Sequence, residues 1–258
     1  MEENLRVEVE DGIAVLTLER PEKLNALTVP MLEALEAAAD RIDRDREVRV
    51  AILTGAGPKA FCCGADIVAW GGLEPLDMWR RWIRRGHRVF DQLARLRVPM
   101  VAAINGHALG GGLELAATAD IRVADTRASF GLPEATIATV PGWSGTQRVT
   151  GLIGAGHVKY MALTGRRLSA EEALRVGLVQ QVADAGSALA AAQAIAADIC
   201  RLAPVSAQLT KQLIDGASGD GLAAALEGMA GALTGTTQDA AEGLASFREK
   251  RAAHYSGQ

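Results

Sequence analysis

Short apolar segments that alternate with helical patterns constrain the fold of this chain more than any other feature. Residues 48–53, 99–104 and 121–124 are short runs of mainly apolar, partly β-branched side chains, bounded by glycine, proline or polar residues. Runs of this length and composition are typical of buried strands. Apolar side chains recur at helical spacing between them, so the sequence predicts an α/β fold with right-handed crossovers.

Local signals predict the elements around these strands. Residues 5–9 and 13–18 flank Asp11-Gly12, which is the pattern of a β-hairpin. Thr28 can cap a helix. The apolar stripe of that helix consists of Leu32, Leu35, Ala38, Ala39 and Ile42. A second, long helix is predicted from the spacing of Leu76, Trp79, Ile83, Phe90 and Leu93.

The C-terminal part has a different pattern. The strand signal nearly disappears after Trp143, and Ser169 to Glu172 form a capping box that starts a helix. We therefore predict a core with the active site at residues 1–190 and a helical oligomerisation region at residues 191–258. This region carries more apolar surface than a small appendage can bury. Its apolar residues include Leu209, Leu213, Leu222, Leu226, Met229 and Leu233.

Composition excludes several classes of protein. The chain has 258 residues, 49% of them hydrophobic, and a net charge of −4, which favours one large core and argues against a basic nucleic-acid surface. The acidic N-terminus lacks the pattern of a secretory signal, and the most apolar stretch, residues 98–121, contains charged side chains that a membrane span disfavours. We expect neither nucleic acid nor membrane as a partner.

Cysteine and histidine usage indicates a reduced protein without a metal site. Cys62, Cys63 and Cys200 show no metal-binding spacing, and an odd count with two adjacent residues is typical of the cytoplasm. The four histidines are scattered along the chain.

The glycine-rich segment of residues 104–120 is the strongest candidate for a functional site. Gly110, Gly111 and Gly112 follow a predicted strand, and without Cβ atoms they let a ligand approach the backbone. The first amides of the following helix have no partner inside it, so they can stabilise an oxyanion. Glu114 lies three residues after Gly111, on the same helical face. A structural glycine turn with a solvated glutamate would give the same pattern.

Two further segments could contribute to such a site. Residues 60–67 follow a strand and a turn, and they could supply a second backbone donor or serve as a structural loop. Glu134 lies on a loop just after a strand, where a solvent-facing glutamate is also common. Residues 110–115 lack the last glycine of a dinucleotide fingerprint, and residues 142–146 lack the last glycine of a nucleophile elbow.

Three blocks, in their order and spacing, resemble the defining blocks of the enoyl-CoA hydratase/isomerase family of the crotonase superfamily. They are AFCCGADI at 60–67, INGHALGGGLELAATADIRVA at 104–124 and FGLPEATIATVPGWSGTQR at 130–148. ERPEKLNAL at 19–27 and TQDAAEGLASFREKR at 237–251 also fit. The resemblance implies a crotonase-like spiral of ββα units with a helical C-terminal trimerisation region, assembled as a homotrimer or a dimer of trimers.

The resemblance also implies roles for individual residues. The amides of Ala65 and Gly111 would form an oxyanion hole for the thioester oxygen, while Glu114 and Glu134 would activate water and move a proton to Cα. The other residues implied to bind the acyl-CoA are Lys23, Leu24, Cys63, Asp66, Ile67, Val68, Gly142, Phe247 and Lys250. No metal or separate cofactor is implied, because coenzyme A is part of the substrate.

The chain departs from the family pattern at three places. Val68 stands where many members have a lysine that faces the CoA phosphates. Trp143-Ser144 replaces a small Ala-Gly pair, so we expect Trp143 to narrow or reshape the acyl pocket. Cys62-Cys63 is unusual beside an oxyanion hole.

Hydration of a trans-2-enoyl-CoA to a 3-hydroxyacyl-CoA, as in fatty-acid β-oxidation, is the leading hypothesis. Adding water builds enolate charge that two N–H donors can stabilise, and two close glutamates can supply one acid and one base. Isomerisation, or another lyase or hydrolase reaction on an acyl-CoA, is the alternative within the family. Outside it, we consider a non-catalytic CoA- or RNA-binding protein and a serine hydrolase that uses Ser144. The acyl group and the pathway stay open.

Overall fold

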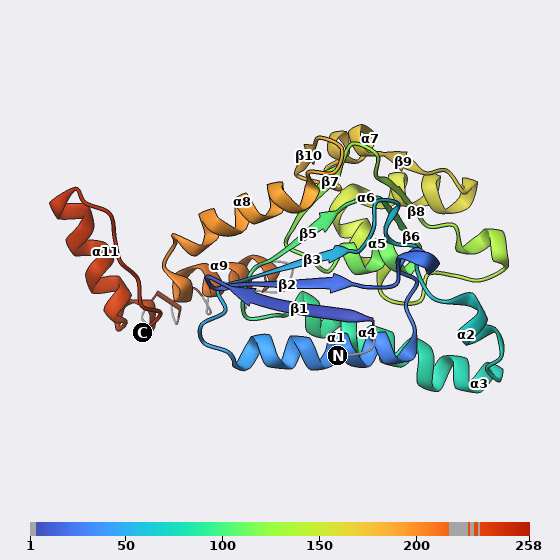
Figure 1. Ribbon diagram of the computed structural model, residues 1–258, viewed down its shortest axis with the longest axis horizontal. Helices are drawn as coiled ribbons and strands as arrows, with labels where there is room; N and C mark the ends of the chain where they lie inside the picture. The colour runs from blue at the N-terminus through green and yellow to red at the C-terminus, as the bar shows by residue number, and fades with distance from the viewer. Residues whose placement is uncertain (1–3, 217–226, 228–229, 232) are drawn as a thin grey trace.

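Two β-sheets organise the computed structural model, which describes residues 4–216, 227, 230–231 and 233–258 (Figure 1). In this part of the chain the larger sheet has the strand order β1 (Leu5–Glu10), β2 (Ile13–Leu18), β3 (Val50–Gly55), β5 (Met100–Ile104), β7 (Ile121–Asp125) and β10 (Gln181–Ala183). The smaller sheet has the order β4 (Ala60–Cys62), β6 (His107–Leu109), β8 (Ser129–Gly131) and β9 (Leu168–Ser169).

Helices connect and cover these strands. The short 3-10 and π segments are η1 (Pro21–Lys23), η2 (Met78–Ile83) and η3 (Glu134–Ile137). The α-helices are α1 (Val29–Arg44), α2 (Ile67–Gly71), α3 (Pro75–Asp77), α4 (Arg84–Ala94), α5 (Gly111–Ala116), α6 (Gly145–Thr164), α7 (Ala170–Arg175), α8 (Ala188–Cys200), α9 (Pro204–Gly216) and α11 (Gln238–Glu249).

The larger sheet begins with the predicted hairpin. β1 and β2 pair antiparallel, and Asp11 and Gly12 between them both have positive φ, of 49° and 80°. Turns of this kind match the twist of the flanking strands. From β2 to β10 all neighbours are parallel. The predicted hairpin and the three predicted buried strands are therefore confirmed.

Side chains of β3 alternate between two hydrophobic cores. Ala51 and Leu53 belong to the larger core, which also contains the buried stripe of α1 and the buried face of α4. Val50 and Ile52 point to the opposite face and pack with small side chains of α8. The sheet is thus covered by α1 and α4 on one face and by α8 on the other (Figure 1). The Thr28 cap and the stripe of α1 are confirmed, since the Thr28 hydroxyl accepts a hydrogen bond from the Met31 amide at 3.3 Å.

The predicted long helix of residues 76–93 is wrong as a continuous α-helix. It is divided into α3, the π-helical segment η2 and α4. A π turn holds more residues than an α turn, so it shifts the apolar stripe out of phase. Leu76 and Trp79 are consequently 59% and 54% exposed, whereas Phe90 and Leu93 are buried.

Four short strands were missed by the sequence pattern. β4 and β6 lie in segments predicted as loops, while β9 and β10 lie where the strand signal had nearly disappeared. They contain two or three residues each, which is too short for an alternation to be recognised.

The C-terminal region begins at the sheet and ends away from it. The predicted boundary at residue 190 falls inside α8, which covers the sheet, and α11 projects from the rest of the molecule (Figure 1). The division into two regions stays a prediction. Of its apolar residues, Leu209 and Leu213 are half-buried and Leu233 is 58% exposed. Leu222, Leu226 and Met229 lie outside the described residues.

Within the described ranges, no single helix is long and apolar enough to cross a membrane. Helices α8 and α9 reach that length and hydropathy only together, and a bend of 111° separates them.

Candidate active site

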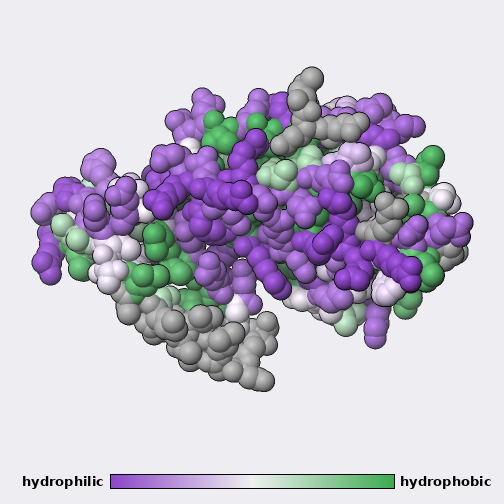
Figure 2. Space-filling view, turned by 90° about the horizontal axis from the view of Figure 1, so that it is seen from below, coloured by the Kyte–Doolittle hydropathy of each residue, from purple (hydrophilic) through white to green (hydrophobic). Residues whose placement is uncertain are grey.

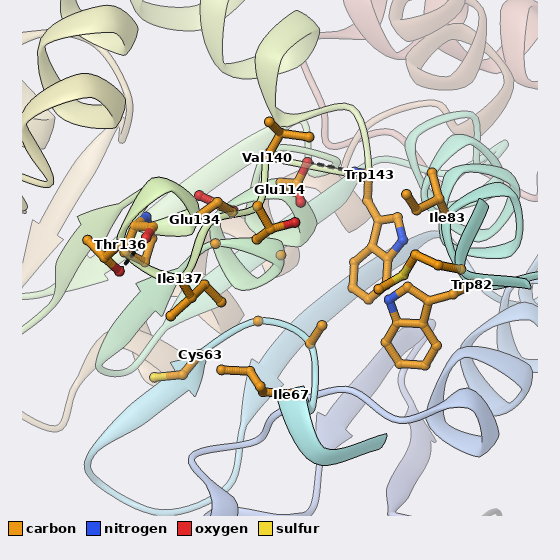
Figure 3. Close-up of a pocket in the computed structure, with 18 residues that line it drawn as sticks. Cys63, Ile67, Trp82, Ile83, Glu114, Glu134, Thr136, Ile137, Val140 and Trp143 are labelled. Carbon is orange, nitrogen blue, oxygen red and sulfur yellow. Dashed lines mark hydrogen bonds between the residues drawn. The ribbon is translucent and has the colours of Figure 1, made fainter. Parts of the chain in front are cut away.

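A cavity of about 200 Å³ opens where the N-terminal end of α5 meets the loop after β4, the segment η2 and the segment from Pro133 to Trp143 (Figure 3). Seven residues to which the resemblance assigns a catalytic or binding role line it: Cys63, Ala65, Ile67, Gly111, Glu114, Glu134 and Gly142. Segments that lie far apart in the chain therefore meet as predicted. Most of the remaining lining is apolar.

The glycines before Glu114 are required by close backbone packing. Gly110 has φ 53° and ψ −128°, and it precedes the first helical residue of α5. A Cβ on Gly112 would lie 1.9 Å from the Cys62 carbonyl oxygen, so α5 contacts β4 directly through its backbone. A Cβ on Gly111 would lie 2.9 Å from the Trp143 ring. Glycine at these positions lets α5 begin here without displacing its neighbours.

Two backbone amides border the cavity next to each other. Leu27 and Ala65 form a parallel bridge in which the Leu27 amide donates to the Gly64 carbonyl and the Asp66 amide donates to the Leu27 carbonyl. The amide of Ala65 therefore points to the opposite side, because successive amides alternate along an extended chain. A Cβ on Gly64 would lie 3.1 Å from the Gly111 nitrogen, so the two amide-bearing segments are in contact.

Glu114 is a buried carboxyl held by backbone donors. It is 2% exposed, and its Oε1 accepts a hydrogen bond from the amide of Trp143 at 2.8 Å (Figure 3). The same oxygen accepts a second hydrogen bond from the amide of Gly145 at 2.7 Å. Burial raises the pKa of Glu114 above its usual value, while these hydrogen bonds favour the ionised form and oppose the rise. Among the described residues, both of these hydrogen bonds go to Oε1, and Oε2 is the oxygen we expect to act on a ligand.

Glu134 is the second carboxyl of the cavity. It lies at the start of η3, and its Oε2 is buried without a hydrogen-bond partner among the described residues. Burial, and to a smaller extent the negative charge of Glu114, raise the pKa of Glu134 to about 7. The two carboxyls differ in their backbone donors, since amides of the segment around Trp143 and Gly145 favour ionisation of Glu114, whereas at Glu134 only the residue's own amide opposes the raised pKa. Pairs of this kind supply an acid and a base to one reaction.

An aromatic wall closes one side of the cavity. The Trp143 ring lies 5.4 Å from the Trp82 ring and 5.2 Å from the Phe90 ring, between centroids. Trp143 fits there because Gly86 of α4 and Gly111 of α5 have no side chains; a Cβ on Gly86 would lie 2.1 Å from the indole nitrogen. The indole fills space beside the glutamates, which agrees with the prediction that Trp143 reshapes the pocket.

Four of the predicted CoA-binding residues lie beside the cavity and do not line it. The amide of Cys63, a lining residue, donates to the Leu24 carbonyl at 3.0 Å. Leu24 and the adjacent Lys23 therefore lie next to the lining without being part of it. The Asp66 carboxylate pairs with Arg20 at 2.7 Å and caps the start of α2. Val68 is 90% exposed.

Phe247 and Lys250 do not reach the cavity of their own chain. Phe247 is 85% exposed on α11, and Lys250 ends that helix in a left-handed conformation. Helix α11 lies at the opposite end of the molecule from α2, which borders the cavity through Ile67 (Figure 1). Their approach to the adenine end of CoA stays a prediction.

Several lining residues were missed in the sequence. Met78, Trp82 and Ile83 come from the π-helical segment, and Thr136, Ile137 and Val140 come from η3 and the loop after it. Of these residues, only Ile83 belonged to the predicted helix stripe, and a π turn has no sequence signal of its own. The proximity of Val140 to Glu134 in sequence was the one available clue.

Two backbone donors and two carboxyls around one apolar cavity define an enzyme site that moves protons next to a polarised carbonyl group. The family model described as enoyl-CoA hydratase/isomerase matches residues 8–258, and the chain belongs to this family. Short-chain-enoyl-CoA hydratase of Clostridium acetobutylicum is 40% identical over 250 residues, which cover 96% of this chain and 95% of that protein.

Further comparisons support the same assignment and the fold. Crotonyl-CoA hydratase of Syntrophomonas wolfei is 36% identical over 259 residues, 98% of each chain. The crystal structure of an enoyl-CoA hydratase from Bacillus anthracis superposes with a TM-score of 0.95 at 37% identity, covering 99% of this chain and 100% of that one. The predicted crotonase-like α/β fold is confirmed.

Proposed function

We propose that the protein hydrates a short trans-2-enoyl-CoA thioester to the 3-hydroxyacyl-CoA. One observation carries this proposal: two carboxyls and two backbone amides border the same cavity. Glu114 accepts hydrogen bonds from two amides, Glu134 has a pKa of about 7, and the amides of Ala65 and Gly111 lie next to them. The names of the relatives from Clostridium acetobutylicum and Syntrophomonas wolfei support the same reaction.

Each group has a defined task in this reaction. The amides of Ala65 and Gly111 bind the thioester oxygen, which gains negative charge as the water oxygen bonds to Cβ. Ionised Glu114 accepts a proton from that water, and the electrons of the double bond move toward the thioester oxygen. Protonated Glu134 then gives its proton to Cα, which restores the thioester carbonyl. Proton transfer from Glu114 back to Glu134 prepares the next turnover.

Hydration is tested by incubating the protein with crotonyl-CoA in heavy-oxygen water. The conjugated absorbance should fall, and the label should be found at Cβ of the product. Isomerisation is the alternative outcome, because moving a double bond needs no water oxygen. Loss of conjugation without label, or double-bond migration in a 3-enoyl-CoA alone, would replace the hydratase assignment.

The aromatic wall predicts a preference for short acyl groups. Trp143→Ala should open the space beside the glutamates and raise kcat/KM for octenoyl-CoA relative to crotonyl-CoA by about tenfold or more, the worth of accepting additional methylenes in an apolar pocket. The measurement is a series of kcat/KM values over enoyl-CoA chain length.

Trp143→Phe is the matched control for this change. It keeps an aromatic wall, and it removes an indole N–H that has no hydrogen-bond partner in the described part of the protein. Its chain-length profile should follow that of the wild type. Trp143→Ala leaves a cavity that costs about 3–5 kcal/mol of stability, so folding is checked by melting. A folded Trp143→Ala with the wild-type profile would show that another element limits the acyl group.

Assembly as a homotrimer or a dimer of trimers is also proposed. Large apolar side chains are exposed along the C-terminal region: Leu202, Ile214, Leu233, Leu244 and Phe247. On the face seen in Figure 2, apolar surface is visible toward the α11 end of the molecule, and further apolar surface lies at the other end. Subunit contacts would cover this surface and bring α11 of one copy toward a neighbouring copy, where Phe247 and Lys250 could meet the adenine end of CoA. The cytoplasm is the compartment we propose, with no membrane or nucleic-acid partner.

Light scattering with size-exclusion chromatography tests the assembly. A mass of about three or six chains is expected at micromolar concentration, because exposed apolar surface of this extent is stabilised by burial between subunits. Phe247→Asp, which places a charge in the proposed contact, should shift the protein toward smaller species. A monomeric wild type would contradict the proposal.

A further inference from the structure

The segment of residues 142–145 holds the catalytic carboxylate through its backbone. The amides of Trp143 and Gly145 both donate to Oε1 of Glu114, and Ser144 lies between them. The position of the carboxylate oxygen therefore depends on the conformation of this segment. Any group that fixes Ser144 also fixes both donors.

Ser144 has an unfavourable backbone conformation for its residue type. Its φ of 76° and ψ of 14° are left-handed, where a Cβ crowds the following carbonyl. Its hydroxyl oxygen lies 2.8 Å from Nδ1 of His87, a half-buried residue in the first turn of α4. This hydrogen bond joins the strained residue to a helix that packs in the main core.

A second contact joins the same two helices one turn further on. Arg148 of α6 pairs with Asp91 of α4. Arg148 lies four positions after Ser144, and Asp91 lies four positions after His87. Docking of α6 on α4 is thus shared between two polar contacts. Only the contact between His87 and Ser144 is adjacent to the residues that hold Glu114. Docking of the two helices and positioning of Glu114 can therefore be separated by experiment.

We propose that His87 and Ser144 are positioning residues that keep the amides of Trp143 and Gly145 aimed at Glu114. Neither side chain lines the cavity as the structure describes it, so both act through the backbone of the segment. The charged or titratable groups that face Glu114 are His87 from α4 and Glu134 from η3. This inference rests on the proposed hydratase function.

Glycine and alanine at position 144 separate backbone strain from the hydrogen bond. Ser144→Gly relieves the left-handed strain and loses the hydroxyl, so it should melt at or above the wild-type temperature yet show kcat about tenfold lower. Ser144→Ala keeps the strain and loses the hydroxyl, so it should lose both stability and kcat. KM for crotonyl-CoA should change little in both, because the cavity lining is unaltered.

Variants of His87 test the other partner. His87→Asn can place a polar atom close to the position of Nδ1 and should retain more kcat than His87→Leu. The control is Asp91→Asn, which weakens the neighbouring contact to Arg148: it should lower the melting temperature while kcat stays within about twofold of wild type.

The pH profile gives a signature that a purely structural role would not produce. Two aimed amides stabilise the ionised form of Glu114, so their misalignment should raise its pKa and move the acid limb of kcat to higher pH. Carbon NMR of the Glu114 carboxyl in Ser144→Gly and wild type reads this shift without turnover. A wild type without hydratase activity would overturn the proposed function, whereas the NMR shift would still test the positioning.

The inference is overturned by either of two results. One is a folded Ser144→Gly or His87→Leu with the kcat and acid limb of the wild type. The other is an Asp91→Asn variant that loses as much kcat as His87→Leu, because the effect would then belong to helix docking in general.

Discussion

Replacing Glu114 or Glu134 with glutamine should lower hydration turnover by more than about a hundredfold in each case. Glutamine keeps the size of the side chain but can neither accept the water proton nor donate the proton to Cα. The double variant should be little slower than either single variant, because residues that act as one unit are not additive. Steady-state kinetics with crotonyl-CoA measures all three variants.

The two glutamine variants should differ in their pH dependence. Glu134 must carry a proton to serve as the acid, and its pKa of about 7 means that kcat of the wild type falls as pH rises above neutrality. Glu114 must be ionised to serve as the base, and its raised pKa makes kcat fall as pH is lowered. Because the two carboxyls interact, the acid and alkaline limbs of the kcat–pH profile report apparent pKa values of the pair and not of either residue alone.

The residual activity of Glu134→Gln should therefore lack the alkaline limb and keep the acid limb. Circular dichroism and melting check the fold of each variant. A single glutamine variant with near-wild-type hydration would remove that carboxyl from the mechanism. Retention of isomerisation by one variant that has lost hydration would indicate a single-carboxyl reaction.

Gly111→Pro should lower kcat by about a hundred- to a thousandfold, the usual effect of removing one oxyanion donor. Proline is tolerated at the first position of a helix, where its missing N–H has no helical partner, so α5 itself can still form. The residue before it is Gly110, which has no Cβ to clash with the proline ring. The expected loss therefore comes from the missing amide.

Gly111→Ala is the matched control, because its Cβ meets the Trp143 ring just as proline does, at 2.9 Å. It keeps the N–H, so it should lose much less kcat than Gly111→Pro. Equal losses in the two variants would assign the effect to displacement of Trp143. A folded Gly111→Pro with near-normal turnover would exclude the amide from the oxyanion hole.

The sequence predicted those parts of the fold that depend on local chemistry. The Asp11-Gly12 turn, the Thr28 cap and the Ser169 capping box are each formed by neighbouring residues, and the structure contains all three. Buried strands such as β3 and β5 were recognisable because both of their faces are covered, which requires continuous apolar runs.

The candidate site was predictable to the extent that its residues have special chemistry. Glycines without side chains and glutamates in apolar segments are conspicuous, so Gly111, Glu114 and Glu134 could be selected before the cavity was known. Apolar lining residues such as Trp82 and Ile83 could not, because core residues have the same composition. The distant placement of Phe247 could not be inferred either, since nothing near it in sequence specifies where α11 projects.

The sequence by itself determined the class of fold, the family and the two carboxyls, because each depends on residue type and short spacing. Only the tertiary structure decided which oxygen of Glu114 accepts the two backbone hydrogen bonds, and that burial raises the pKa of both carboxyls. It also brought His87 next to Ser144, 57 positions away in the chain, and set Trp143 between two glycines of different helices. Burial and hydrogen-bond geometry are properties of packed neighbours, and no local pattern specifies them before the chain has folded.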